Sequence, residues 1–173
     1  MGLATAKKLA SEGMNICIVH RDRKSNLKKF EAEVKQMQSS GITVKTFNKD
    51  ALKEEVREEI IKDLPKHSVK ILLHSIAKGS LKTMNASKET MLTKQDFDIT
   101  IHAMATSWYE WTQTMIEHES FAKGARNIAF TSEGNSRVWP GYAAVSAAKS
   151  VLEALMRNMA VELAPLNITT NCI

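Results

Sequence analysis

The chain has 173 residues, of which 43% are hydrophobic and 25% charged, so it is large enough for one domain with a substantial core. No apolar run approaches the roughly 20 residues that span a bilayer, and the N-terminus lacks the apolar core of a signal peptide. The composition excludes a disordered or membranous chain and favours a cytoplasmic protein.

The net charge of +5 does not come from a concentrated basic patch. Lys and Arg are spread along the chain and interleaved with Asp and Glu, which argues against a nucleic-acid partner. The His and Cys residues show no metal-ligand spacing, so no metal site is predicted. Cys17 and Cys172 each lie in an apolar, strand-like run, which predicts buried thiols rather than a disulfide.

Apolar residues recur with helical spacing in five segments, and short apolar or β-branched runs separate them. The predicted helices cover residues 2–12, 25–37, 52–64, 94–119 and 142–164, and the predicted strands cover 15–20, 42–47, 69–73, 127–130 and 168–173. Helices that alternate with short buried strands predict a parallel sheet in a Rossmann-like, doubly wound α/β fold. No repeat or low-complexity linker interrupts the pattern, so we expect residues 1–173 to form one domain.

Polar side chains follow four of the predicted strands. These clusters are Arg21-Asp22-Arg23, Asn48-Lys49-Asp50, His74-Ser75-Ile76-Ala77 and Thr131-Ser132. Each cluster alone is ordinary loop composition. Ligands of doubly wound folds bind beyond the carboxyl ends of the strands, so together the clusters favour one binding edge.

Tyr142 and Lys149 stand seven residues apart in the last predicted helix, so they share one face and lie two turns apart. A Tyr hydroxyl can act as an acid toward a carbonyl or enolate oxygen, and a nearby ammonium favours its ionised form. The pair therefore indicates a site of acid chemistry. The same spacing also suits a Tyr that covers the core and a solvated Lys.

With these residues, the chain resembles the short-chain dehydrogenase/reductase family over essentially its whole length. Residues 2–24 resemble the family's first helix, second strand and cofactor-selecting turn, and NMAVELAPLNITTNCI resembles its run into the sixth strand. Three marks are more similar to the enoyl-[acyl-carrier-protein] reductase branch: the Tyr142 to Lys149 spacing, the turn LHSIA at 73–77 and the loop TSEGNSRVWPGY at 131–142. Most of the family spaces Tyr and Lys four apart, and Val145 fills that position here.

The resemblance implies an NADPH-dependent reductase, with NADH as the alternative cofactor, that reduces the 2,3 double bond of an enoyl thioester in fatty-acid synthesis. The thioester carrier would be acyl carrier protein or coenzyme A. Tyr142 would stabilise the enolate oxygen, and Lys149 would hold the nicotinamide ribose and keep positive charge near Tyr142. Ser132 lies where enoyl reductases often carry a second hydroxyl and would make a supporting contact beside Thr131.

Further cofactor contacts also follow from the resemblance. The matching positions are Gly2, Arg21, Arg23, Asp50, Ala51, Ser75, Ile76, Ala77, Thr131 and Lys149. Arg21 and Arg23 lie where a basic side chain pairs with the 2′-phosphate of NADP, although Asp22 between them blurs this inference, and solvated arginines are the alternative. Asp50 would meet the adenine ring, and residues 75–77 would line the cofactor mostly with backbone.

The long helix of residues 94–119 departs from the family pattern at His102, which stands where many members carry an Asn of a proton relay. A neutral His could hold a water there, but a lone His is more often structural. Trp108, Tyr109 and Trp111 follow on the same helix. We expect them to serve as core or as the contact of a homodimer or homotetramer.

The resemblance begins and ends inside the family pattern. Met1 and Gly2 match only the end of the family's glycine-rich phosphate loop, so its first strand is missing, and the chain stops before its substrate-binding helices and final strand. The missing first strand is central in the family, between residues 15–20 and 69–73. An incomplete Rossmann-like sheet and an inactive fragment are therefore expected. The alternatives are a 3-oxoacyl-thioester reductase and a non-catalytic relative.

Overall fold

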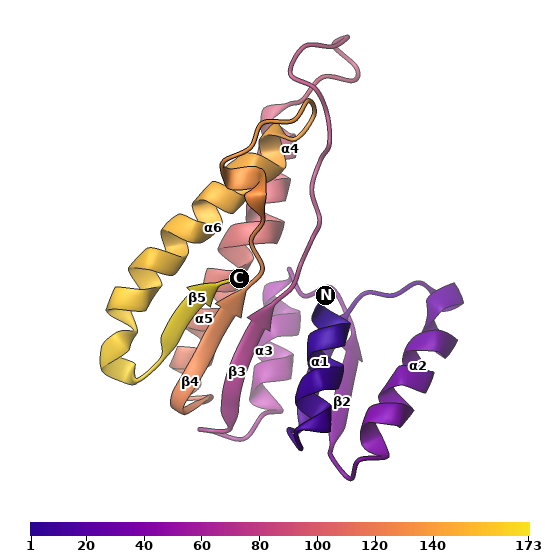
Figure 1. The fold of residues 1–173 in the computed structure, drawn as a ribbon, viewed down its shortest axis with the longest axis vertical. Coiled ribbons are helices and arrows are strands. Elements are labelled where there is room, and N and C mark those ends of the chain that lie inside the picture. Colours follow the sequence, from indigo (N-terminus) through magenta and orange to yellow (C-terminus); the bar gives the residue numbers. More distant parts are fainter. The chain divides into compact units, whose positions relative to one another are not determined.

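The computed structural model describes residues 1–173 as helices that alternate with parallel strands (Figure 1). The predicted α/β class is therefore confirmed. Contacts divide the chain into two compact units, Met1–Ile60 and Ile61–Ile173. No helix is long and apolar enough to cross a membrane.

The first unit is a two-stranded parallel sheet with helices packed against it. Its elements are α1 (Gly2–Ser11), β1 (Ile16–His20), α2 (Lys24–Gln38) and β2 (Val44–Asn48), and α3 (Glu54–Lys62) spans the boundary to the second unit. A small apolar cluster of Ala10, Met37 and Val44 joins the helices to the sheet, with Ile16 and Ile18 packed against it. This cluster is the core of the unit.

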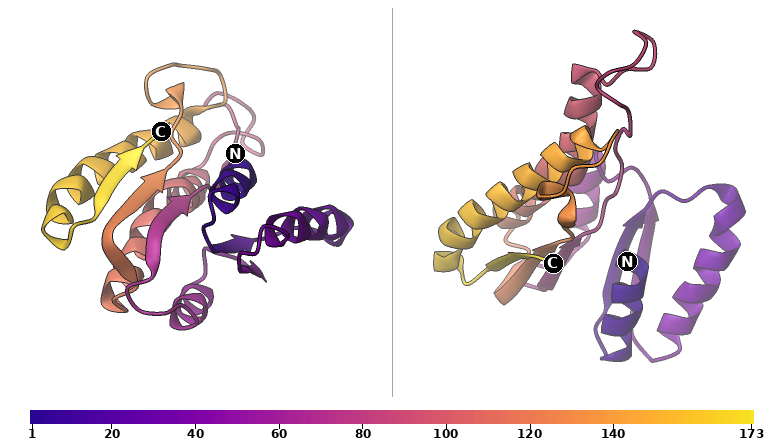
Figure 2. Two further views of the ribbon diagram at one scale, coloured as in Figure 1. Left: turned by 60° about the horizontal axis from the view of Figure 1, so that its bottom comes forward. Right: turned by 45° about the horizontal axis from the view of Figure 1, so that its top comes forward.

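The second unit is a three-stranded parallel sheet in the order β3-β4-β5, drawn from magenta to yellow in Figure 2. Its elements are β3 (Val69–His74), α4 (Lys94–Ile101), the π-helical turn η1 (His102–Thr106), α5 (Ser107–Glu117), β4 (Phe121–Ala129), the 3₁₀ turn η2 (Glu133–Asn135), α6 (Ala143–Glu162), the 3₁₀ turn η3 (Ala164–Leu166) and β5 (Thr169–Cys172). Trp108 of α5 and Leu152 of α6 are completely buried with Ala129 of β4 in one apolar cluster. This packing holds α6 against β4 and β5.

A buried polar network joins α5 to β4. The Trp108 indole nitrogen donates to the Asn127 side-chain oxygen at 2.5 Å, and the Asn127 amide nitrogen donates to the Thr112 hydroxyl at 3.0 Å. Each of these polar groups has a partner, as burial requires. Trp108 and Trp111 are buried, which confirms the core reading for these two, whereas Tyr109 is exposed.

β1 and β3 belong to different sheets, so no strand pairing joins them. The expectation that β1 and β3 are buried strands is wrong: most of their side chains are half-buried, and Lys70 is exposed. The predicted burial of Cys17 is also wrong. Side chains alternate along a strand, so with Ile16 and Ile18 in the core, Cys17 faces the opposite side and is exposed. Cys172 is partly buried, and neither cysteine is in a disulfide.

Two predicted elements differ in extent. β4 begins at Phe121 rather than near residue 127, because Lys123, Gly124 and Arg126 hide its strand pattern while pointing outward. The single helix predicted over 94–119 is interrupted by the π-helical turn η1. π-Turns inside helices are frequent at functional sites.

Candidate active site

Tyr142 lies directly before the first residue of α6, at the end of the loop that follows β4. Its ring meets the Trp139 ring edge-on, with 5.3 Å between the centroids. Gly134 leaves room for this ring, because a Cβ there would come within 2.6 Å of Tyr142 Cε1. Trp139 and Gly134 therefore set where the Tyr142 ring can lie.

Lys149 lies two turns further along α6 and is 6% exposed. Its ammonium donates to the carbonyl of Phe130, just beyond the end of β4, at 2.7 Å. Burial lowers the pKa of Lys149, and the nearby Cys172 and Glu153 oppose this shift. The alternative of a solvated Lys149 is thereby excluded. Seven residues of helix separate Tyr142 and Lys149 by about 10 Å along the axis, so they form two points along one site rather than a contact pair.

The hydroxyls of Thr131 and Ser132 hold the loop between β4 and α6. The Thr131 hydroxyl donates to Glu153 Oε1 at 2.7 Å, and the Thr131 amide donates to the Ile173 carbonyl at 2.9 Å. Ser132 caps η2, since its hydroxyl accepts from the Gly134 amide at 3.4 Å. Both residues thus lie at the carboxyl end of β4, with Ser132 within two residues of the glycine that borders Tyr142.

His74 ends β3 and is a buried residue whose contacts the sequence did not reveal. Its Nε2 and the Ser107 hydroxyl are 2.9 Å apart and share a hydrogen bond, and Ser107 also donates to the Ala103 carbonyl at 3.1 Å. Burial, followed by the charge of Lys149, lowers the pKa of His74 to about 4. His74 is therefore neutral at physiological pH and ties the sheet edge to η1. In the sequence, the only signal was a His directly after the apolar run Ile71-Leu72-Leu73.

His102, by contrast, points to Glu110, with 3.2 Å between His102 Nε2 and Glu110 Oε1. Its side chain is 42% exposed. The structural reading of His102 agrees with this contact.

Val145 occupies the position four residues before Lys149 and is buried. A Cβ on Gly79 would come within 3.2 Å of Val145 Cγ2, so the segment after β3 packs closely on this side chain. This position therefore holds apolar packing and carries no hydroxyl.

Three of the predicted cofactor residues of unit 2 lie directly after β3. Ser75, Ile76 and Ala77 form an irregular turn in which Ile76 is half-buried and its two neighbours are exposed. No regular secondary structure occupies their backbone. A turn of this kind can present peptide groups to a ligand.

In unit 1, the structure brings together two predicted residues. Arg21 donates to Asp50 Oδ2 at 2.7 Å, linking the turns after β1 and β2. The Asp22 carboxylate instead forms a hydrogen bond with His20 Nδ1, with 2.9 Å between Nδ1 and Oδ2. The backbone of Asp22 is hydrogen-bonded to the side chain of Asn48. Arg23 precedes the first residue of α2. The remaining predicted positions, Gly2 and Ala51, lie in the first turn of α1 and in the turn after β2.

Surface grooves lie beside α2 and beside β5, and neither is lined by Tyr142 or Lys149. No group of three or more His, Cys, Asp or Glu side chains could hold a metal ion. The chemistry available at the end of α6 is therefore that of a hydroxyl and an ammonium above the carboxyl ends of parallel strands.

Comparison with known proteins agrees with this fold and site. A family model described as "Enoyl-(Acyl carrier protein) reductase" matches residues 1–173. Dehydrogenase/reductase SDR family member 4 of Sus scrofa is 24% identical over 179 residues, covering 100% of this chain and 60% of that protein. The chain thus spans 60% of the length of this curated relative.

Two solved structures show the same fold. A short-chain dehydrogenase/reductase from Serratia marcescens BCRC 10948 has a TM-score of 0.83 at 25% identity, over 99% of this chain and 67% of that one. A short-chain dehydrogenase from Burkholderia cenocepacia J2315, solved in complex with NADP, has a TM-score of 0.79 at 19% identity over the same shares. The parallel strands and the Tyr142–Lys149 helix place the molecule among Rossmann-like α/β proteins. Within that class, the chain belongs to the short-chain dehydrogenase/reductase family.

Proposed function

We propose that the protein is an NAD(P)H-dependent reductase whose substrate is an enoyl thioester of fatty-acid synthesis. The observation that carries this proposal is α6, which presents Tyr142 at its N-terminus and the buried Lys149 two turns later. Val145 between them leaves no hydroxyl at the four-residue spacing. The seven-residue spacing is the mark of the enoyl reductase branch.

The donor groups of each unit suit a dinucleotide. In unit 1, the Arg21 and Arg23 guanidinium groups could pair with a 2′-phosphate, and Asp50 could accept from an adenine ring. In unit 2, the Lys149 ammonium could donate to ribose hydroxyls beside the turn of residues 75–77. The NADP complex of the Burkholderia relative supports NADPH as the preferred cofactor.

The chain's own residues would act on the substrate oxygen. When bound, the reduced nicotinamide supplies the hydride. The Tyr142 hydroxyl donates a hydrogen bond to the thioester oxygen, where negative charge grows in the transition state, and the positive charge of Lys149 favours that charge. The partly exposed ring of Trp139 lies edge-on to the Tyr142 ring and would offer an apolar contact to an acyl substrate.

A carbonyl reductase, such as a 3-oxoacyl-thioester reductase, is the second candidate. The porcine relative is named a dehydrogenase/reductase, which favours it. Either enzyme would work as a homodimer or homotetramer, and the exposed Tyr109 on α5 offers a contact for a second subunit.

The decisive experiment measures NADPH oxidation by the full-length protein with a 2-enoyl thioester and with a 3-oxoacyl thioester. Faster turnover of the enoyl substrate is expected, and Tyr142→Phe should reduce kcat by roughly 10²–10⁴-fold because it removes the proton donor. Tyr109→Phe is the matched control, since Tyr109 is the only other Tyr and is 45% exposed on α5. Preference for the oxo substrate would establish the carbonyl reductase, and no turnover of either would favour a non-catalytic relative.

A further inference from the structure

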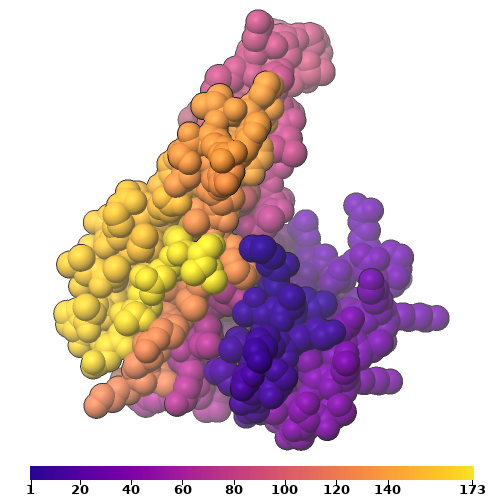
Figure 3. All heavy atoms as spheres, in the orientation of Figure 1, coloured from indigo at the N-terminus to yellow at the C-terminus, as the bar shows by residue number.

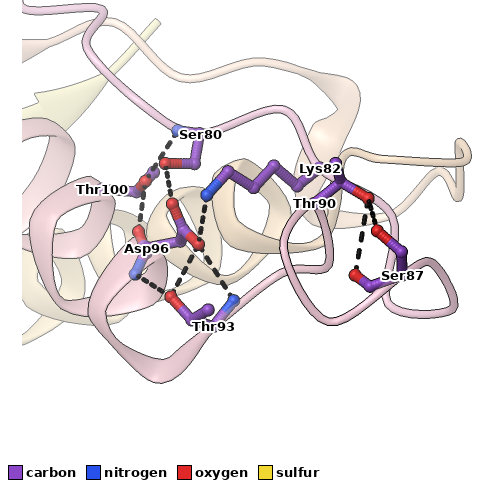
Figure 4. A network of polar contacts seen from close by, with 7 residues as sticks. All are labelled: Ser80, Lys82, Ser87, Thr90, Thr93, Asp96 and Thr100. Carbon is purple, nitrogen blue, oxygen red and sulfur yellow. Dashed lines mark hydrogen bonds and ion pairs between the residues drawn. The ribbon is translucent and has the colours of Figure 1, made fainter.

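Asp96 lies in the first turn of α4 and is 7% exposed. It forms a capping box with Thr93: the Asp96 amide donates to the Thr93 hydroxyl at 3.3 Å, and the Thr93 amide donates to Asp96 Oδ2 at 2.9 Å (Figure 4). A capping box of this kind begins a helix. It uses only part of the hydrogen-bonding capacity of the carboxylate.

The same carboxylate also holds the segment that follows the turn of residues 75–77. The Ser80 hydroxyl donates to Asp96 Oδ1 at 2.7 Å, and the Lys82 ammonium donates to Oδ2 at 3.0 Å (Figure 4). The Ser80 amide donates to the Thr100 hydroxyl at 3.0 Å, and that hydroxyl donates to the Asp96 carbonyl at 2.7 Å. The hydrogen bonds that the carboxylate accepts, first from Ser80 and then from Thr93 and Lys82, hold the pKa of Asp96 well below its usual range. The carboxylate therefore stays charged and ties residues 80–82 to α4.

The other side of this segment borders the Tyr142 end of α6. A Cβ on Gly79 would come within 3.2 Å of Val145 Cγ2, and one on Gly141 would come within 3.9 Å of the Leu81 and Lys82 backbones. Gly141 precedes Tyr142, and Val145 follows it by one turn. The loops that contain residues 79–93 and 131–142 accordingly lie side by side in the second unit (Figure 1, Figure 3).

We propose that Asp96 is a positioning residue of the active site: through Ser80 and Lys82 it holds residues 79–82 against Gly141 and Val145, and so fixes the place of Tyr142. This role rests on the proposed function of Tyr142. Asp96 would thus have two roles, as part of the capping box and as the anchor of residues 79–82. The second role is separate because the capping box involves neither Ser80 nor Lys82.

Three variants of the full-length protein separate the two tasks. Asp96→Asn keeps the shape of the side chain but removes the charge that holds Lys82. Thr93→Ala removes the hydroxyl of the cap and leaves the Ser80 and Lys82 contacts in place. Asp98→Asn is the matched control, because Asp98 lies two residues further along α4 and pairs only with the exposed Lys94 among the interactions seen.

Two readouts are measured on each variant: amide hydrogen exchange by mass spectrometry, and steady-state kinetics with NADPH. In Asp96→Asn, we expect exchange in residues 79–83 and in residues 133–142 to become about tenfold faster, because charged hydrogen bonds are lost. We expect kcat to fall by roughly 10- to 100-fold, since small misplacements of a reacting group are costly, with the KM for NADPH within about twofold. Thr93→Ala should lower the unfolding temperature but keep kcat, and Asp98→Asn should resemble the wild type.

Unchanged exchange in residues 133–142 of Asp96→Asn would overturn the proposal, as would an equal loss of kcat in Thr93→Ala. If the wild type turns over neither substrate, the proposed function fails. The exchange data then still decide whether Asp96 orders the loop before Tyr142.

Discussion

His74 links the protonation of one side chain to the stability of the fold. It is 6% exposed at the end of β3, and its pKa is lowered from 6.5 to about 4, chiefly by burial. Between these pH values the unfolded chain binds a proton that the folded chain does not. Stability therefore falls as the pH drops from 6.5 to about 4, by about 3 kcal/mol for this group.

A His74→Gln variant tests this linkage, because Gln stays neutral and its amide can still bond to Ser107. Between pH 7 and pH 4, the free energy of unfolding of the wild type should fall by about 3 kcal/mol more than that of the variant. Urea denaturation at both pH values measures it. If the free energy of unfolding changed with pH equally in the two proteins, the pKa of His74 would be the same in the folded and unfolded chains.

The helix α6 could be predicted because the spacing of its apolar residues depends only on neighbouring positions in the sequence. The helical period predicted Lys149 two turns into the helix, where α6 has it, whereas Tyr142 lies directly before the first residue of α6 rather than within the helix. The partners of these residues could not be predicted. Lys149 bonds to a carbonyl 19 residues away, and His74 bonds to a hydroxyl 33 residues away, so only the tertiary fold brings them together.

At the scale of elements, the helix of residues 94–119 shows what periodicity misses. The apolar pattern predicts one helix, but five residues from His102 to Thr106 form a π-helical turn. Ser107 closes this turn and bonds to His74, so the tertiary contact and the change of hydrogen-bond register coincide. The start of α4 was easier to predict, since Thr93 is a local capping signal, whereas the Ser80 and Lys82 contacts of Asp96 are not local.

The loop between β4 and α6 gives a prediction that concerns the shape of the site. Gly134 faces the Tyr142 ring, and an added Cβ would lie 2.6 Å from Tyr142 Cε1, so Gly134→Ala must displace the ring. A displacement of this size should reduce kcat by about 100-fold and lower the free energy of unfolding by roughly 1–3 kcal/mol, because overpacking is destabilising. Kinetics and thermal denaturation measure both, with Ser136→Ala in the same loop as the control.

A Gly134→Ala protein with wild-type kcat would show that the position of the Tyr142 ring does not limit turnover. It would also weaken the assignment of Tyr142 as the proton donor. The same loss of activity in Ser136→Ala would instead indicate a general effect on the loop.

At the scale of the whole molecule, the alternation of helices and strands was enough to predict parallel pairing, whereas the separation of β1 from β3 was expected only from the family resemblance. The division into Met1–Ile60 and Ile61–Ile173 could not be predicted, because no change in composition marks it. Strand burial was also mispredicted. An apolar run such as ICIVH predicts a covered strand only where neighbouring strands and helices exist to cover it.

The two units should differ in local stability, which tests whether residues 1–173 behave as the single domain that the sequence predicts. The first unit rests on two strands and a core of Ala10, Met37 and Val44, and isolated two-stranded sheets are marginal. The second unit buries Trp108 and Leu152 completely. Native-state hydrogen exchange of the 173-residue chain should therefore show amides of β1 and β2 exchanging about tenfold or more faster than those of β4, through separate opening of the first unit. Equal protection of all strands, lost together in denaturant, would mean that the chain unfolds as one cooperative domain.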